Sequence, residues 1–213
     1  MLDATPEGRE ISYADAADTV RGLMAHYRAA GYGLGHRVGL FLESRPEHLL
    51  HKLALNALGV CCVPINPDYR PRELAYVVDH AKVNLIVALS SRQDAVQAAL
   101  ALTQYQPPVA LLEDIALRPL PHAHTPTAPG EPTGDTPASI LYTSGTTGQP
   151  KGCVLSHTYE LAAGHWYAHQ GGLGAVREGQ ERLYNPLPLF HVFAAYPILM
   201  SMIASGAHVV FPT

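Results

Sequence analysis

The sequence contains few charged residues, little cysteine and a single tryptophan. Only 15% of the 213 residues are charged, the net charge is −4, and there are three cysteines. A weakly acidic chain without clustered Lys and Arg lacks the electrostatic footprint of a nucleic-acid-binding protein. Three cysteines cannot build a disulfide framework, and the adjacent Cys61 and Cys62 lie in an apolar run, where cysteine acts as a small hydrophobe. These absences exclude nucleic acid as a partner and indicate a reducing compartment.

The amino terminus shows no targeting signal. Residues 1–7 contain neither the basic region nor the apolar core of a signal peptide. One apolar stretch, residues 193–211, runs for 19 residues without a charge, which is near the length of a membrane span. Pro197 and the pair at 205–206 interrupt it, so a helix followed by a buried strand at 207–211 explains it better. We expect a cytoplasmic protein without a transmembrane segment, and its oligomeric state is left open.

Short apolar runs alternate with amphipathic helical patterns along much of the chain. Strand–helix units in this order predict a parallel sheet, because parallel neighbours need crossover connections. The apolar runs are continuous, as expected for strands that are buried on both faces. The sequence therefore predicts the α/β class, with a mostly parallel sheet flanked by helices on both faces. The expected helices span 15–30, 45–58, 72–81, 94–102 and 159–169, and the expected strands span 38–42, 60–65, 83–89, 109–112 and 140–142.

Local patterns also predict how particular elements begin or end. Ser44 and Glu47 have the spacing of a capping box, which predicts that Ser44 caps the second helix. Ser156 is expected to begin the fifth helix. Near the carboxyl end we expect the strand at 207–211 to form an open sheet edge, and the apolar helix at 194–205 to face solvent.

A change in composition divides the chain. Residues 118–137 contain six prolines and no helical period, which is typical of an extended connector. We therefore predict an amino-terminal α/β subdomain over 1–117, a proline-rich connector over 118–137, and a third segment over 138–213.

The start of the third segment has the chemistry of a polyphosphate site. The apolar strand at 140–142 runs into a loop of hydroxyl residues and glycine, and Lys151 follows. Glycine lets backbone N–H groups approach phosphate oxygens, hydroxyls add donors, and lysine supplies a positive charge. The loop is not a Walker A motif, because Pro150 stands where that motif needs its second glycine. A plain polar turn is the alternative interpretation. The predicted phosphate-binding residues are Thr143, Ser144, Gly145, Thr146, Thr147, Gly148 and Lys151.

The twelve histidines suggest a metal site that their spacing does not support. His165 and His169 are four residues apart, but the glutamate of an H-E-x-x-H motif is missing and no acidic or cysteine partner has ligand spacing. We therefore predict no metal site. His191 differs, because Phe190 and Val192 place it in an aromatic, apolar turn. It is either a core histidine or part of a substrate pocket.

Two motifs resemble those of the adenylate-forming superfamily, which includes acyl-CoA synthetases, luciferases and the adenylation domains of peptide synthetases. Residues 140–151 (ILYTSGTTGQPK) are compatible at every position with the phosphate-binding signature of that superfamily. Residues 187–192 (LPLFHV) resemble its next motif, in the expected order. Residues 8–13 and 63–67 match weaker features, so the resemblance extends from about residue 8 to the end of the chain.

The resemblance implies a two-step ligase. A carboxylate attacks the α-phosphorus of MgATP to give an acyl-adenylate and pyrophosphate, and coenzyme A then takes the acyl group. The loop 143–148 would hold the β- and γ-phosphates, and Lys151 would add charge during catalysis. Phe190 and His191 would bound the acyl pocket, with His191 helping to place the carboxylate. The implied partners are thus a small carboxylic acid, ATP with Mg²⁺, and coenzyme A.

The chain departs from the superfamily in two respects. It stops before the residues that hold adenine and ribose, the acidic residue near Mg²⁺ and the adenylation lysine, and Ala194-Ala195 replaces a glycine often found there. We interpret it as the N-terminal part of an acyl-CoA synthetase, with the acyl-pocket region of 138–213 incomplete. Alone, it is expected not to catalyse ATP–pyrophosphate exchange. The alternatives are an amino-acid adenylation domain of a peptide synthetase and a non-catalytic nucleotide-binding fragment.

Overall fold

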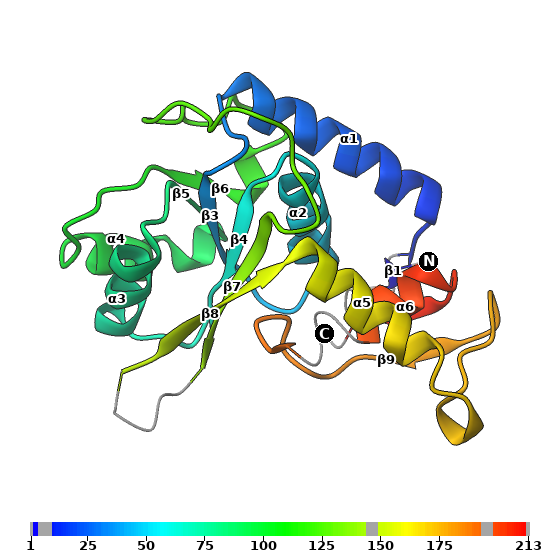
Figure 1. Cartoon of the computed structure of the whole chain (residues 1–213). Coiled ribbons are helices and arrows are strands. Elements are labelled where there is room, and N and C mark those ends of the chain that lie inside the picture. The colour runs from blue at the N-terminus through cyan, green and yellow to red at the C-terminus, as the bar shows by residue number, and fades with distance from the viewer. Residues whose placement is uncertain (1, 4–9, 144–148, 193–197, 212–213) are drawn as a thin grey trace.

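The computed structural model describes residues 2–3, 10–143, 149–192 and 198–211, which form two β-sheets and the helices around them (Figure 1). The large sheet has six strands in the order β6-β5-β3-β4-β7-β8. Its strands are β3 (Arg37–Phe41), β4 (Cys61–Pro64), β5 (Leu85–Ala88), β6 (Val109–Leu111), β7 (Pro137–Thr143) and β8 (Lys151–Ser156). All neighbours pair in parallel except β7 and β8, so the predicted mostly parallel sheet is confirmed.

Helices cover both faces of the large sheet, as predicted. The helices are α1 (Tyr13–Ala29), α2 (Pro46–Ala57), α3 (Pro71–Ala81), α4 (Gln93–Leu100), α5 (His157–Ala168) and α6 (Leu199–Ala204). One core cluster joins α1 and α2 to Val38 and Leu40 of β3, and another joins α3 and α4 to Phe41 of the same strand. Successive strand residues point to opposite faces, so these runs must be apolar throughout. In Figure 1, α1 and α2 lie on one side of the sheet and α3 and α4 on the other.

A second sheet was not predicted. It has four strands in the order β2-β1-β10-β9, namely β1 (Leu2–Asp3), β2 (Glu10–Ile11), β9 (Arg182–Tyr184) and β10 (His208–Val210). Because β10 lies between β1 and β9, the expectation of an open sheet edge at 207–211 is wrong. The pairing of Leu2 with Val209 joins the two ends of the chain, and no local sequence pattern reports such a contact.

The apolar segment before β10 is packed rather than open to solvent. In α6, Leu199, Ser201 and Met202 are buried, and α6 packs along α5. The first residues of the expected helix, 194–197, lie outside the described part of the chain. Within the described ranges, no helix has both the length and the apolar character needed to cross a membrane.

The predicted capping box at Ser44 is wrong. α2 begins at Pro46 with Arg45 as its N-cap residue, and Ser44 Oγ instead accepts a hydrogen bond from the backbone N–H of Leu189, 3.0 Å away. The cap at Ser156 is confirmed, since its Oγ accepts a hydrogen bond from the N–H of Tyr159. At Ser44 the hydroxyl therefore serves a tertiary hydrogen bond to Leu189 and not the helix cap that the sequence spacing predicts.

Strand β8 was also missed, because its sequence has no strand-like alternation. It pairs antiparallel with β7, with Tyr142 opposite Gly152 and Thr143 opposite Lys151. Most of β8 is exposed or half-buried, and only Leu155 is fully buried. Sequence periodicity detects a strand through its buried face, and β8 has almost none.

The proline-rich connector lies against the α1–α2 layer. The N–H of Ala123 donates to the carbonyl of Ala30, and the N–H of Ala128 donates to that of Leu34. His36 Nε2 lies 2.9 Å from the carbonyl oxygen of Thr125. The predicted boundaries at 117 and 137 stay predictions.

A buried ion pair ties the amino-terminal layer to the third segment. Lys52 Nζ in α2 lies 2.7 Å from Glu160 Oε2 in α5, and the two side chains are only 3% and 6% exposed. The ammonium also donates to Ser139 Oγ in β7 at 2.9 Å and to Asn56 Oδ1 at 2.8 Å. Taking two charges out of water is costly, so this pair depends on its geometry and on these additional hydrogen bonds.

Removing one partner of the Lys52–Glu160 pair should therefore destabilise the fold strongly. Lys52→Ala leaves the Glu160 carboxylate buried without its charge partner, and we expect the free energy of unfolding to fall by about 3–5 kcal/mol. The double variant Lys52→Met/Glu160→Leu should recover most of this loss, as measured by denaturant unfolding. The control is Arg177→Ala, which breaks an exposed ion pair with Glu181 and should leave the melting temperature unchanged. Equal effects of Lys52→Ala and Arg177→Ala would contradict the assignment.

Close packing of α5 against α6 depends on Gly164. A Cβ at this position would approach the carbonyl carbon of Met200 to 3.1 Å and the backbone nitrogen of Ser201 to 3.2 Å. Both atoms belong to the backbone, so a side chain there would force the two helices apart.

We expect Gly164→Ala to lower the free energy of unfolding by about 1–3 kcal/mol, as overpacking does. Gly22→Ala is the matched control, because Gly22 lies in α1 with open space around it. It should raise stability by up to about 1 kcal/mol through helix propensity alone. The two thermal melts should therefore shift in opposite directions, and shifts of the same sign would refute the close-packing argument.

Candidate functional site

A hollow of about 490 Å³ lies beyond the carboxyl ends of β4 and β7. Open α/β sheets usually bind ligands at the carboxyl ends of their strands, where loops rather than side-chain layers close the surface. The hollow is lined by Asn66, Tyr69, Glu73, Leu141, Tyr142, Thr143, Pro150, Phe190, His191 and Val192.

The hollow brings together three of the residues predicted from the sequence. Thr143, at the end of β7, lines it together with Phe190 and His191, which follow it by more than forty residues. Lys151 lies opposite Thr143 in the β7–β8 register and is exposed, but it is not part of the lining. The other predicted phosphate-binding residues, 144–148, lie outside the described residues.

The turn that carries His191 is held by its neighbours. Leu189 is buried, and its N–H donates to Ser44 Oγ. The N–H of His191 donates to the carbonyl of Pro188 at 3.0 Å, while the imidazole itself is exposed and lies with its centroid 5.4 Å from that of Phe190. His191 is thus not a core histidine, which was one of the two interpretations that the sequence allowed. It lies at the surface, in the lining of the hollow.

A cluster of aromatic side chains beside the hollow was not predicted. Tyr76 and His80, one turn apart on α3, have stacked rings with centroids 5.4 Å apart. The ring of Tyr142 meets both edge-on, and its hydroxyl lies 2.7 Å from His80 Nδ1. The Tyr76 hydroxyl donates to the carbonyl of Pro150 at 3.0 Å. The spacing of Tyr76 and His80 is visible in the sequence, but their partners on β7 and before β8 are not.

The polar lining of the hollow includes two phenols, Tyr69 and Tyr142, and one carboxylate, Glu73. Burial raises the pKa of Tyr142, and burial together with Glu73 raises the pKa of Tyr69, so both hydroxyls stay available as donors. Glu73 Oε2 accepts a hydrogen bond from the N–H of Arg70 at 2.8 Å. Among the described residues, no group of three or more His, Cys, Asp or Glu side chains is arranged to hold a metal ion.

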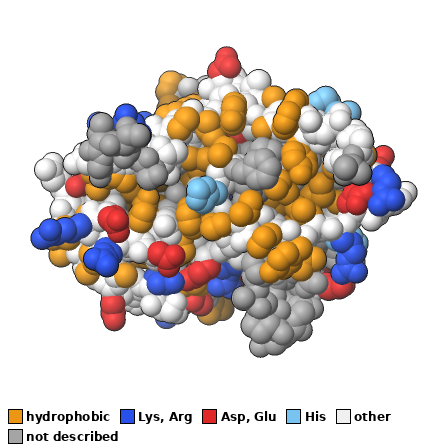
Figure 2. Space-filling view, turned by 90° about the horizontal axis from the view of Figure 1, so that it is seen from below, with side chains coloured by type: hydrophobic (Ala, Val, Ile, Leu, Met, Phe, Trp, Pro, Cys, Tyr) orange, Lys and Arg blue, Asp and Glu red, His pale blue; other side chains and the backbone are white. Residues whose placement is uncertain are grey.

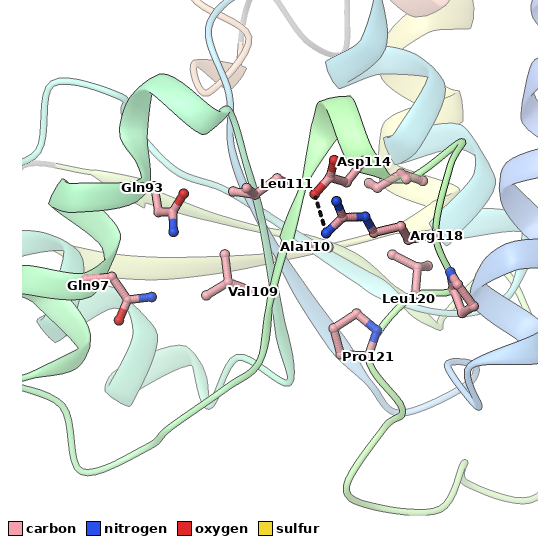
Figure 3. Close-up of a pocket in the computed structure, with 11 residues that line it drawn as sticks. Gln93, Gln97, Val109, Ala110, Leu111, Asp114, Arg118, Leu120 and Pro121 are labelled. Carbon is pink, nitrogen blue, oxygen red and sulfur yellow. Dashed lines mark ion pairs between the residues drawn. The ribbon is translucent and has the colours of Figure 1, made fainter.

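A different hollow, of about 300 Å³, lies along β6 at the other edge of the large sheet (Figure 3). Gln93 and Gln97 of α4 face it from one side, and Leu120 and Pro121 from the other. Its one ion pair in the view joins Asp114 to Arg118 at 3.6 Å. It contains none of the residues predicted from the sequence, so it is not the candidate site.

In Figure 1, β9 and the segment after it run along the lower side of the molecule. Figure 2 shows this side from below, with hydrophobic side chains over much of its middle and charged ones mainly toward its margins. Tyr184, Leu187 and Val192 are among the exposed large apolar residues of the chain. The turn that carries His191 therefore has exposed apolar side chains on both sides of it in the sequence, those of Leu187 and Val192.

Comparison with known proteins finds relatives along nearly the whole chain. Over 208 residues the chain is 29% identical to a sulfoacetate–CoA ligase of Cupriavidus necator, an alignment that covers 96% of this chain and 40% of the relative. It is 31% identical over 202 residues to the medium/long-chain-fatty-acid–CoA ligase FadD6 of Mycobacterium tuberculosis, covering 93% of this chain and 33% of that relative.

A solved structure shows the same fold. ATP-bound MatB from Rhodopseudomonas palustris superposes with a TM-score of 0.80 at 25% identity, over 99% of this chain and 41% of that one. The chain therefore spans well under half the length of these relatives. The profile of the AMP-binding enzyme family matches residues 2–213, and the chain accordingly belongs to the AMP-binding enzyme family.

Proposed function

We propose that this chain supplies the phosphate-binding and carboxylate-facing part of an ATP-dependent carboxylate–CoA ligase that works through an acyl-adenylate. The observation that carries the proposal is the hollow at the ends of β4 and β7, which joins Thr143 to Phe190 and His191. A ligase of this kind must hold a polyphosphate and a carboxylate side by side. The names of the relatives, which are CoA ligases for sulfoacetate and for fatty acids, support a carboxylic acid as the substrate class.

In the first proposed step, a carboxylate oxygen attacks the α-phosphorus of ATP and pyrophosphate leaves. Negative charge collects on the leaving group, so catalysis depends on positioning and on electrostatic stabilisation. Thr143 and the sequence 144–148 would donate hydrogen bonds to the β- and γ-phosphates, and the exposed ammonium of Lys151 would add charge. In the second step the coenzyme A thiolate attacks the acyl carbon and AMP leaves.

The magnesium ion fits this site as part of the nucleotide substrate. Mg²⁺ is usually held by substrate phosphates and one or two carboxylates rather than by a complete protein cage. Glu73 is a carboxylate that lines the hollow, and the described residues offer no larger acidic cluster. The proposed substrate is therefore MgATP.

Titration of the chain with MgATP tests the proposal directly. We expect the amide resonances of Thr143, Lys151 and Gly152 to shift, and inorganic pyrophosphate to compete for the same site. Saturating MgATP that leaves these resonances unmoved would refute a phosphate site at the β7–β8 pair.

Lys151→Ala should weaken MgATP binding by about 10- to 100-fold, since it removes a charge-assisted contact worth roughly 1.5–3 kcal/mol. Calorimetric titration gives the dissociation constants, and Lys151→Arg should retain much of the affinity. Arg28→Ala, which removes an exposed cation from α1, is the control and should bind as the original chain does. If Arg28→Ala and Lys151→Ala weaken binding equally, the contribution of Lys151 is only general charge.

His191→Ala should change carboxylate handling more than nucleotide binding, because the imidazole of His191 lies beside the ring of Phe190 and is followed by the exposed apolar Val192. Michaelis constants for MgATP and for the carboxylate, measured in an active ligase that contains this chain, separate the two effects. We expect the constant for the carboxylate to rise several-fold and that for MgATP to stay within about twofold. A defect confined to MgATP would place His191 on the phosphate side instead.

A further inference from the structure

We infer that Tyr76, His80 and Tyr142 form a brace that holds the β7–β8 pair in position for phosphate binding. The inference rests on the proposed function, because it assigns positioning residues to the same site. Two hydrogen bonds define the brace: the Tyr76 hydroxyl donates to the carbonyl of Pro150, and the Tyr142 hydroxyl pairs with His80 Nδ1.

The brace grips both strands where they approach the predicted phosphate-binding residues. Tyr142 immediately precedes Thr143, and Pro150 immediately precedes Lys151. Thr143 and Lys151 form the last pair of the β7–β8 register, so the carbonyl of Pro150 lies beyond the ladder. The contact from Tyr76 therefore extends the support of β8 past the point where strand pairing ends.

The helix that carries two residues of the brace, α3, is packed firmly in the core. On α3, Leu74, Val77, Val78 and Ala81 are buried in the core that this helix shares with α4 and the sheet. Tyr76 and His80 lie at the edge of that buried face, with their rings stacked. Motion of the β7–β8 pair relative to the sheet would have to break the two hydrogen bonds and the edge-on contacts of Tyr142.

Gly152 makes room for the brace. It lies opposite Tyr142, and a Cβ at this position would come within 3.3 Å of Tyr142 Cζ and 3.0 Å of Ile140 Cγ2. The ring of Tyr142 thus lies directly against the backbone of β8. This close approach couples the position of the ring to the backbone that leads to Lys151.

Such a brace would act on binding through preorganisation. Groups that are already in place before the ligand arrives do not have to be ordered when it binds, and loss of that order lowers affinity without removing a ligand contact. Tyr76 and His80 are not part of the lining of the hollow, so their effect on a nucleotide must pass through Tyr142 and Pro150. They are positioning residues.

The test combines amide hydrogen exchange with MgATP titration on the full chain. Tyr76→Phe removes only a hydroxyl, and His80→Ala removes the partner of Tyr142. His80→Asn restores a hydrogen-bonding group near the place of Nδ1. Tyr105→Phe is the matched control, because Tyr105 is 44% exposed and the described residues provide no partner for its hydroxyl.

We expect Tyr76→Phe and His80→Ala to speed exchange at residues 142–143 and 151–153 by about 3- to 10-fold and to raise the MgATP dissociation constant by a similar factor. His80→Asn should recover part of both changes, and Tyr105→Phe should match the original chain in both. Unchanged exchange in Tyr76→Phe and His80→Ala overturns the brace. Faster exchange with an unchanged dissociation constant overturns its role in binding.

The titration separates this inference from the proposed function. If the original chain does not bind MgATP, the proposed function fails, and the exchange rates then report only a structural brace. If the original chain binds MgATP and the brace variants bind it equally well, the inference fails while the proposed function stands.

Discussion

The structure depends on the buried ion pair between Lys52 and Glu160. These residues are 108 positions apart, and Ser139, which shares the Lys52 ammonium, is 87 positions away. Because an unpaired charge in the interior is so costly, any arrangement that separates α2 from α5 is strongly disfavoured while both charges are present. Strand β7 and helix α5, which follows β8, are thereby fixed to the amino-terminal layer. This contact therefore helps to position the predicted phosphate-binding residues at the ends of β7 and β8.

A second set of contacts places the turn that carries His191 and the β7–β8 pair. Ser44, just before α2, holds the turn of Leu189 through a single hydrogen bond, and α3 holds the β7–β8 pair through Tyr76 and His80. Two segments thus bound the hollow, the β7–β8 pair and the turn of Leu189. The first is held by α3, and the second is held by Ser44, which precedes α2. The predicted site residues after position 140 thus depend on contacts with Ser44 and α3 for their placement.

Much of the large sheet is predictable because its strands are buried on both faces. The expected runs at 38–42 and 60–65 correspond to Arg37–Phe41 and Cys61–Pro64, and α3 begins one residue before the expected 72. Elements with little buried surface were missed, as β8 shows, and so were the short strands β1, β2 and β9. The capping-box prediction at Ser44 failed because the backbone N–H of Leu189, far away in the sequence, binds the same hydroxyl.

The sequence by itself determined the α/β class, the order of the main strand–helix units and the chemical character of Thr143, Lys151 and His191, because periodicity and side-chain type are local properties. Only the tertiary structure decided that His191 is exposed beside Phe190, that β10 lies inside a sheet, and that Tyr76 and His80 reach Tyr142 and Pro150. These outcomes depend on contacts between residues far apart in the chain. The free energy that stabilises such contacts comes from burial and hydrogen bonding, and both exist only once the layers have packed.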